Sequence, residues 1–174
     1  MIFYTDGEVV IRTMTGADVK ALADGEIAQG WGDTTEKHET RLRDQAAGRC
    51  IPLAAEYCGQ TAGYLSVYRR VEHGPFAELG WPELVDFGVL EKFRGRGVGG
   101  KLMDAAERLA GEWSSTVGVG VGLHSGYGSA QRMYVKRGYV PDGSGVWFWD
   151  EICPPYGDCR NDDSLVLYLS KKLR

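Results

Sequence analysis

The stretch VLEKFRGRGVGGKL, residues 89–102, decides how the rest of the sequence is interpreted. A predicted strand ends near Val89, a turn follows, and an amphipathic helix is expected to begin near Gly97. The turn carries two arginines, Arg94 and Arg96, and glycines at positions 95, 97, 99 and 100. Glycine lets a ligand approach the backbone closely, and a helix N-terminus offers unpaired N–H groups and about half a positive charge. These features together predict a binding site for a phosphorylated ligand.

The spacing of the turn residues separates several glycine-rich motifs. Glycines 95, 97 and 100 formally match a dinucleotide fingerprint, but that motif needs an acidic residue about 20 residues further on, at a strand end. Glu112 is in range and lies in the predicted helix instead. The sequence has no Gly-x-x-x-x-Gly-Lys-Ser/Thr motif. Arg94, Gly97 and Gly99 fit Arg-x-x-Gly-x-Gly, placed after the strand sequence LVDFGV; a glycine-rich turn without a ligand is the alternative.

This pattern resembles the acyl-coenzyme A pyrophosphate loop of the GNAT superfamily of N-acetyltransferases. A second segment, YGSAQRMYVKRGY at residues 127–139, resembles the family pattern Asn-x-x-Ala-x-x-x-Tyr-x-x-x-Gly-Phe/Tyr. Ala130, Tyr134, Gly138 and Tyr139 match it, and Tyr127 stands where the family commonly has Asn. The resemblance is specific over about residues 83–140, because two motifs occur in the right order.

The resemblance implies a single α/β domain over residues 1–174, with its motif-bearing core at about 83–140. The expected fold is a mixed, mostly antiparallel sheet flanked by helices, with parallel central strands near 83–89 and 117–123 that splay around acetyl-CoA. The sequence pattern itself predicts helices over 17–28, 34–47 and 129–137, a helix after the turn, and a polar insertion at about 150–163. It also predicts strands at 8–13, 51–57, 61–71 and 165–169, and at 116–123, where alternating glycines leave room for a closely packed group.

Composition limits the functional classes. The chain has 174 residues, 43% hydrophobic and 25% charged, which suits one globular domain with a real core. A net charge of −4 argues against binding nucleic acid, and neither a signal peptide nor a run of 18 apolar residues occurs, so no membrane association is expected. The expected location is the cytoplasm, where the four cysteines would be reduced. A homodimer is left open.

The resemblance also assigns catalytic roles. Tyr134 is the expected general acid, because a phenol is protonated at neutral pH and can donate a proton to the departing thiolate. Glu83 matches the strand position that serves as the base in part of the family. A base is needed because an ordinary primary amine, with a pKa of about 10.4, is almost wholly protonated at pH 7. Asp86 and a water chain are the alternatives for that role.

The cofactor implied by the resemblance is acetyl-CoA, and a backbone N–H near Val89 or Leu90 is expected to polarise its thioester. The residues expected to bind the cofactor are Phe87, Val89, Leu90, Arg94, Gly95, Arg96, Gly97, Val98, Gly99, Gly100 and Tyr127. Trp31, between the first two helices, and Trp147, next to the acidic insertion, are candidates for binding the substrate. The three histidines show no ligand spacing, so no metal is expected.

The sequence therefore predicts acetyl-CoA-dependent N-acetylation of a small-molecule amine, by direct attack in a ternary complex. Two other functions stay open. One is an acyl-CoA-binding sensor or interaction module without turnover. The other is acetylation of a protein or peptide amine, which needs an open groove that the insertion at 150–163 would tend to obstruct.

Overall fold

The structure, a computed structural model, describes residues 1–173. The backbone forms two compact units: the first comprises Met1–Tyr68 and Leu84–Leu109, and the second Arg69–Glu83 and the residues from Ala110 onward. Strand β5 (Glu83–Val89) and helix α3 (Val98–Gly111) each pass from one unit into the other. The single-domain organisation remains a prediction. Within the described residues, no helix is both long and apolar enough to cross a membrane.

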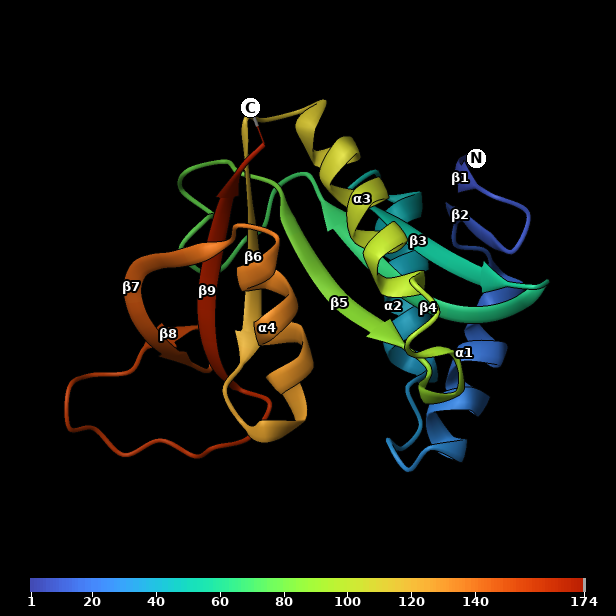
Figure 1. Ribbon diagram of the computed structural model, residues 1–174. Helices are drawn as coiled ribbons and strands as arrows, with labels where there is room; N and C mark the ends of the chain where they lie inside the picture. Colours follow the sequence, from blue (N-terminus) through green and yellow to red (C-terminus); the bar gives the residue numbers. More distant parts are fainter. Residues whose placement is uncertain (174) are drawn as a thin grey trace. The chain divides into compact units, whose positions relative to one another are not determined.

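The first unit is built on strands in the order β1-β2-β3-β4-β5, and β1 to β4 pair antiparallel. Helices α1 and α2 lie on one face of these strands, and α3 lies on the other (Figure 1). The bounds of the elements, besides β5 and α3, are β1 Ile2–Thr5, β2 Val9–Thr13, α1 Gly16–Ala28, α2 Thr35–Ala46, β3 Cys50–Tyr57, β4 Gln60–Tyr68 and the short 3₁₀ turn η1 Glu91–Phe93.

Helix α3 buries the apolar stripe that its sequence predicts. Residues at helical spacing, from Val98 and Leu102 to Ala106 and Leu109, are at most 5% exposed. The first of them, Val98, follows the glycine-rich turn directly. Burial of this stripe therefore fixes the N-terminus of α3 beside the turn.

Helix α2 presents a polar side to the strands instead. Glu26 of α1 is fully buried, and its carboxylate accepts hydrogen bonds from His38 Nε2 at 2.8 Å, Lys37 Nζ at 3.2 Å, Tyr64 OH at 2.5 Å and the hydroxyl of Thr34. Burial alone would raise the pKa of Glu26, but the hydrogen bonds from His38, Thr34 and Tyr64 lower it to about 2. This network of charged and polar groups ties α1, α2 and β4 together, in addition to the apolar contacts of Leu22, Leu42 and Tyr64.

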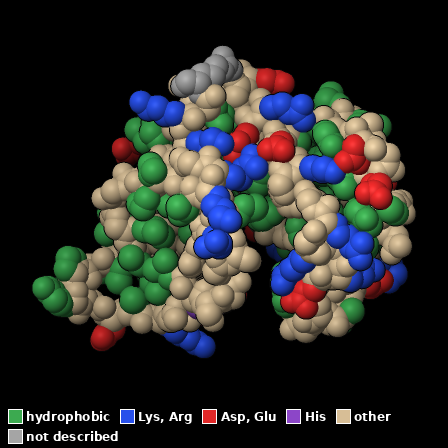
Figure 2. All heavy atoms as spheres, in the orientation of Figure 1, with side chains coloured by type: hydrophobic (Ala, Val, Ile, Leu, Met, Phe, Trp, Pro, Cys, Tyr) green, Lys and Arg blue, Asp and Glu red, His purple; other side chains and the backbone are tan. Residues whose placement is uncertain are grey.

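The second unit has strands in the order β6-β9-β7-β8, and all three neighbouring pairs are antiparallel. Figure 1 shows helix α4 beside β6 and β9. Figure 2 shows apolar side chains over the region of β7 and β8, where Trp149, Ile152 and Tyr156 are exposed. The elements are β6 Thr116–Gly122, the 3₁₀ turn η2 Ser125–Tyr127, α4 Gly128–Lys136, β7 Val140–Phe148, β8 Glu151–Ile152 and β9 Leu165–Lys172.

The glycine face of β6 is filled by aromatic side chains. A Cβ added at Gly118 would lie 2.2 Å from the ring of Phe76, and one at Gly122 would lie 2.4 Å from the ring of Tyr127. The valines on the opposite face are buried. The predicted close packing against this face is confirmed, and rings occupy it.

Several predicted boundaries were wrong. Strand β1 was missed, because its residues are exposed or only partly buried at a sheet edge and show no apolar alternation. Strand β4 ends at Tyr68 rather than at residue 71. The sequence left open whether residues 146–149 continue a strand that starts at 139 or form its hairpin partner. In the structure residues 140–148 form one strand, whose pairing with β9 is irregular between Pro141 and Val146, and the 150–163 insertion contributes the short strand β8.

Candidate functional site

The glycine-rich turn has a backbone that only glycine adopts easily. Gly95 has φ +75° and Gly97 has φ +78°, both in the left-handed region. The turn follows η1, which ends with Arg94 N–H donating to the Glu91 carbonyl at 3.1 Å. All residues from Arg94 to Gly97 are exposed. The turn therefore presents its backbone to solvent at the N-terminus of α3.

The backbone N–H groups of this turn are available to bind a ligand. The first backbone hydrogen bond of α3 runs from Lys101 N–H to the Gly97 carbonyl at 3.2 Å, so the amides of residues 98–100 have no partner within the helix. Across the described chain, the amides of residues 95–97 also make no backbone hydrogen bond outside regular elements. These unpaired donors, at the positive end of the α3 dipole, fit the diphosphate of a nucleotide.

The two arginines rest on aromatic rings of the same unit. The Arg94 guanidinium lies 5.5 Å from the ring centroid of Trp31, and Nη1 pairs with Glu91 Oε1 at 3.2 Å. Arg96 lies 5.1 Å from the ring centroid of Tyr57. The structure thus brings the candidate substrate residue Trp31 against the candidate cofactor residue Arg94. Both guanidinium groups remain exposed and can rotate toward an anion.

Gly99 and Gly100 differ in the space that surrounds them. A Cβ at Gly99 would lie 3.1 Å from Cζ of Phe87, so this glycine lets α3 pack closely on β5. A Cβ at Gly100 would meet no atom of residues 1–173 within 4 Å, and its φ is not in the left-handed region. Neither protein packing nor backbone conformation requires glycine at position 100, so its role in binding a cofactor remains a prediction.

A hydrogen bond at the end of β5 rules out one of the two amides predicted to polarise a thioester. Leu90 N–H donates to the Ala62 carbonyl at 2.9 Å, so this amide is already occupied. Of the two amides predicted to polarise a thioester, only that of Val89 stays a candidate. The Val89 carbonyl, for its part, accepts a hydrogen bond from Arg94 Nε at 3.3 Å.

Glu83 belongs to the second unit and is an unusual carboxyl group. It is 8% exposed, and no basic residue pairs with it in the part of the chain that the structure describes. Burial, together with the negative charge of Asp150, raises the pKa of Glu83 to about 8. A carboxylate with such a pKa is a far stronger base than an ordinary one and still ionises near neutral pH.

Tyr134, on α4 in the same unit, is 3% exposed, and its ring lies 5.7 Å from that of Tyr139. Burial, with a smaller contribution from Tyr127, raises the pKa of the Tyr134 phenol well above its usual value. The hydroxyl therefore keeps its proton throughout the neutral range. A general acid requires that protonation state.

Tyr127 and Trp147 have well-defined partners within the second unit. The Tyr127 hydroxyl donates to Asp163 Oδ1 at 2.9 Å, while its ring packs on Gly122. Trp147 Nε1 donates to Ser144 Oγ at 2.7 Å, and its ring lies edge-on to Tyr168 at 5.5 Å. These contacts fix both side chains, and the roles assigned to them in binding cofactor and substrate remain predictions.

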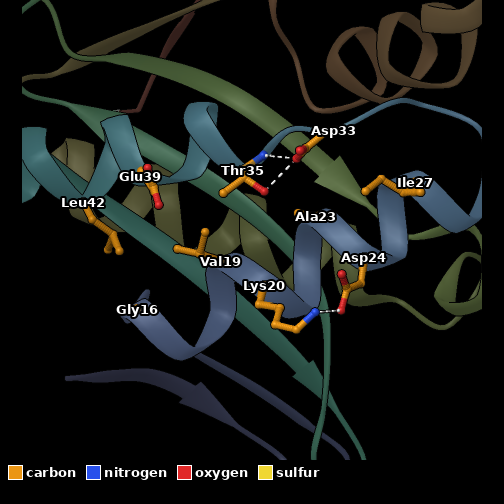
Figure 3. A pocket seen from close by; sticks show the side chains of 10 residues that line it. All are labelled: Gly16, Val19, Lys20, Ala23, Asp24, Ile27, Asp33, Thr35, Glu39 and Leu42. Carbon is orange, nitrogen blue, oxygen red and sulfur yellow. Dashed lines mark hydrogen bonds and ion pairs between the residues drawn. The ribbon is translucent and has the colours of Figure 1, made fainter.

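A groove of about 510 Å³, which was not predicted from the sequence, lies between α1 and α2 of the first unit. In Figure 3, side chains of both helices point into the space between them. The groove is lined by Gly16, Val19, Lys20, Ala23, Asp24, Ile27, Asp33, Thr35, Glu39 and Leu42. It has an apolar floor and an acidic rim, on which only Lys20 is basic. Lys20 is paired with Asp24 at 2.7 Å.

A further polar cluster was missed beside Asp86, the alternative base. Arg41 Nε on α2 donates to Asp86 Oδ2 at 2.6 Å, and Arg41 Nη1 donates to the Tyr68 hydroxyl at 2.6 Å. Asp86 itself has φ +55°, inside β5. The only sign of this cluster in the sequence is the spacing of Lys37, His38 and Arg41, which places them on one face of α2. That spacing by itself is typical of a solvated helix face.

Comparison with known proteins gives the family. The model described as "Acetyltransferase (GNAT) family" matches residues 19–139, more than half of the chain. Among curated protein sequences, none matches this chain.

Solved structures share the fold. The acetyltransferase that modifies the N-terminal serine of ribosomal protein L7/L12 in Salmonella typhimurium has a TM-score of 0.72, with 11% identity and 99% of each chain covered. The protein yncA of Salmonella typhimurium, solved with its cofactor acetyl-CoA, has a TM-score of 0.66, with 18% identity and coverage of 97% and 95%. The ribosomal-protein-alanine N-acetyltransferase of Brucella melitensis has a TM-score of 0.66, with 21% identity and coverage of 93% and 98%. The predicted fold class is confirmed.

Proposed function

Because the chain belongs to the GNAT acetyltransferase family, we propose that it is an acetyl-CoA-dependent N-acetyltransferase that acetylates a primary amine of a small molecule in the cytoplasm. The observation that carries this proposal is the exposed turn at 94–100, whose backbone N–H groups have no partner in α3 and whose Gly100 has no structural reason to be glycine. When bound there, acetyl-CoA supplies an activated acetyl thioester.

The residues of this chain would have the following roles in cofactor binding and acetyl transfer. The amides of residues 95–100, with Arg94 and Arg96, would hold the diphosphate. Glu83, as a carboxylate, would accept a proton from the ammonium group of the acceptor, either directly or through water, and so release the neutral amine for attack. Tyr134 would give its phenolic proton to the departing thiolate. The amine attacks the acetyl carbon directly in a ternary complex, so no side-chain nucleophile is needed. As the C–N bond forms and the C–S bond breaks, the nitrogen would lose a second proton, which solvent would return to the Tyr134 phenolate.

A turnover screen tests this proposal. The protein would be mixed with acetyl-CoA and separate classes of amine (diamines, aminoglycosides, amino acids, and peptides with free N-termini), while the released thiol is measured with a chromogenic disulfide. We expect release that depends on a small amine. Turnover with peptides alone would establish a protein acetyltransferase instead, and tight coenzyme A binding without any turnover would establish a binding module.

The change Gly100→Ala tests the phosphate site without disturbing the fold. An added Cβ has open space in the protein, and alanine favours a helix over glycine by about 0.5–1 kcal/mol, so the melting temperature should hold or rise. The same methyl group would obstruct a diphosphate seated on these amides. We expect the Kd for coenzyme A to rise at least ~10-fold, which is about 1.4 kcal/mol.

Gly16→Ala is the matched control, because Gly16 also lies in the first turn of a helix and a Cβ there meets no atom of the described chain within 4 Å. Calorimetric titration should show its coenzyme A affinity unchanged. Equal affinities for Gly100→Ala and Gly16→Ala would argue against the assigned phosphate site.

A further inference from the structure

Asp86 has an unusual backbone conformation for its place in the fold. Five residues other than glycine have a positive φ within residues 1–173; the other four lie in turns or in the loop after β8, whereas Asp86 lies inside β5. Side chains with a Cβ adopt this conformation only at a cost in free energy, although aspartate tolerates it better than most. Such an outlier persists when its surroundings hold it, and it commonly marks a functional position.

Arg41 holds Asp86 in place through an ion pair. Its guanidinium donates from Nε to the Asp86 carboxylate and from Nη1 to the Tyr68 hydroxyl, both at 2.6 Å. Tyr68 in turn donates to Asp44, which also pairs with Arg49. The planar guanidinium is fixed on two sides, so the direction of its Nε–H is fixed as well. The Arg41 and Asp86 side chains are 21% and 24% exposed, so solvent screens their pairing only partly.

The backbone conformation of Asp86 determines the direction in which the chain continues through residues 87–90. Gly88 packs so closely on Tyr64 that a Cβ there would lie 2.6 Å from the ring. Phe87 packs against Gly99 of α3, and Val89 offers its carbonyl to Arg94. Residues 87–90 thus connect Asp86 with the glycine-rich turn, and they include the Val89 amide that is the remaining candidate for polarising a thioester.

We propose that Arg41 is a positioning residue for acetyl transfer: its ion pair holds Asp86 in the left-handed conformation and thereby aims the backbone of residues 87–89 at the thioester. Arg41 acts through Asp86 and touches no reacting atom. The proposal rests on the proposed function, since it names a residue that serves the same site.

The test uses glycine to separate backbone conformation from charge. Arg41→Met removes the ion pair, and we expect kcat to fall at least ~10-fold, because small displacements of catalytic groups are costly. The KM for acetyl-CoA should stay within about threefold, because the diphosphate is bound elsewhere. In the double variant Arg41→Met/Asp86→Gly, glycine adopts a positive φ without help, so kcat should recover to within about threefold of the wild type.

Two controls make each outcome decisive. Arg43→Met, on the exposed side of the same helix, should leave kcat unchanged. Asp86→Asn, which accepts the same hydrogen bond and tolerates the same φ, should keep most of the activity even if Arg41→Met fails to fold. Unchanged kcat in Arg41→Met, no recovery in the double variant, or a loss in Asp86→Asn equal to that in Arg41→Met would overturn the proposal.

Failure of the proposed function would be seen separately, as no turnover by the wild type. The backbone amide resonances of residues 87–90 then give the readout. We expect them to shift in Arg41→Met and to return toward their wild-type positions in the double variant. Resonances that do not move in Arg41→Met would contradict the positioning role whatever the activity.

Discussion

Replacing Tyr134 with phenylalanine should lower turnover about 100- to 1000-fold and leave the affinity for acetyl-CoA within about twofold of the wild type. The variant keeps the buried ring and loses only the hydroxyl. Burial raises the pKa of this phenol, so in the wild type it carries a proton at neutral pH. If Tyr134 is the proton donor proposed above, its loss leaves the thiolate to depart unprotonated. Steady-state thiol release and calorimetric titration with coenzyme A measure the two quantities.

Tyr139→Phe is the matched control, because this ring is 5.7 Å from that of Tyr134 and equally buried. Its turnover should stay close to that of the wild type, since the family pattern admits either Phe or Tyr at this position. If Tyr134→Phe retained more than about a third of wild-type turnover, Tyr134 would be a core residue and another proton donor would be required.

Glu83→Gln should have the second large effect, a loss of about 100-fold or more in kcat/KM at pH 8. A general base acts in its ionised form, and the pKa of Glu83 is raised to about 8 by burial and by Asp150. The kcat/KM of the wild type should therefore rise with pH up to about 8. In Glu83→Gln the rise should no longer level off near pH 8 and should instead follow deprotonation of the acceptor amine itself, toward its pKa of about 10.4. A variant with the wild-type pH profile would exclude Glu83 as the base.

The same carboxyl group should make folding stability depend on pH. In the unfolded chain a glutamate titrates near 4.3, whereas in the folded protein Glu83 keeps its proton up to about 8. Between these two values the folded state binds more protons, so the contribution of Glu83 to stability decreases as the pH rises. Glu83→Gln should therefore melt at a higher temperature than the wild type at pH 8 and differ little at pH 4. Glu112→Gln, an exposed acid of the same unit, should show no such difference.

The turn and α3 could be predicted from sequence because their causes are local. Two glycines with positive φ, an arginine on either side of the first, and an apolar stripe at helical spacing are each visible in the residues themselves. The alternation of valine and glycine in β6 predicted close packing for the same reason. What fills the glycine face, the rings of Phe76 and Tyr127, comes from elsewhere in the chain and could not be predicted.

The polar side of α2 was hidden because its partners are distant in sequence. In the sequence, three polar residues on one face of α2 are typical of a solvated face: Lys37, His38 and Arg41. In the structure they contact two tyrosines of β4, Tyr64 and Tyr68. In β5, Asp86 contacts Arg41 and Gly88 packs on Tyr64, both partners being distant in sequence. The left-handed backbone of Asp86 could not be inferred, because aspartate is common in ordinary strands and turns alike.

Calorimetric titration with coenzyme A and with pantetheine, which lacks the diphosphate and the nucleotide, tests most directly whether residues 94–100 hold a diphosphate. We predict saturable binding of one coenzyme A per chain, with an affinity at least ~100-fold higher than that for pantetheine, a difference of about 2.7 kcal/mol. Equal affinity for the two ligands, or no saturable binding of coenzyme A, would contradict the assignment of the turn and the enzymatic function proposed from it.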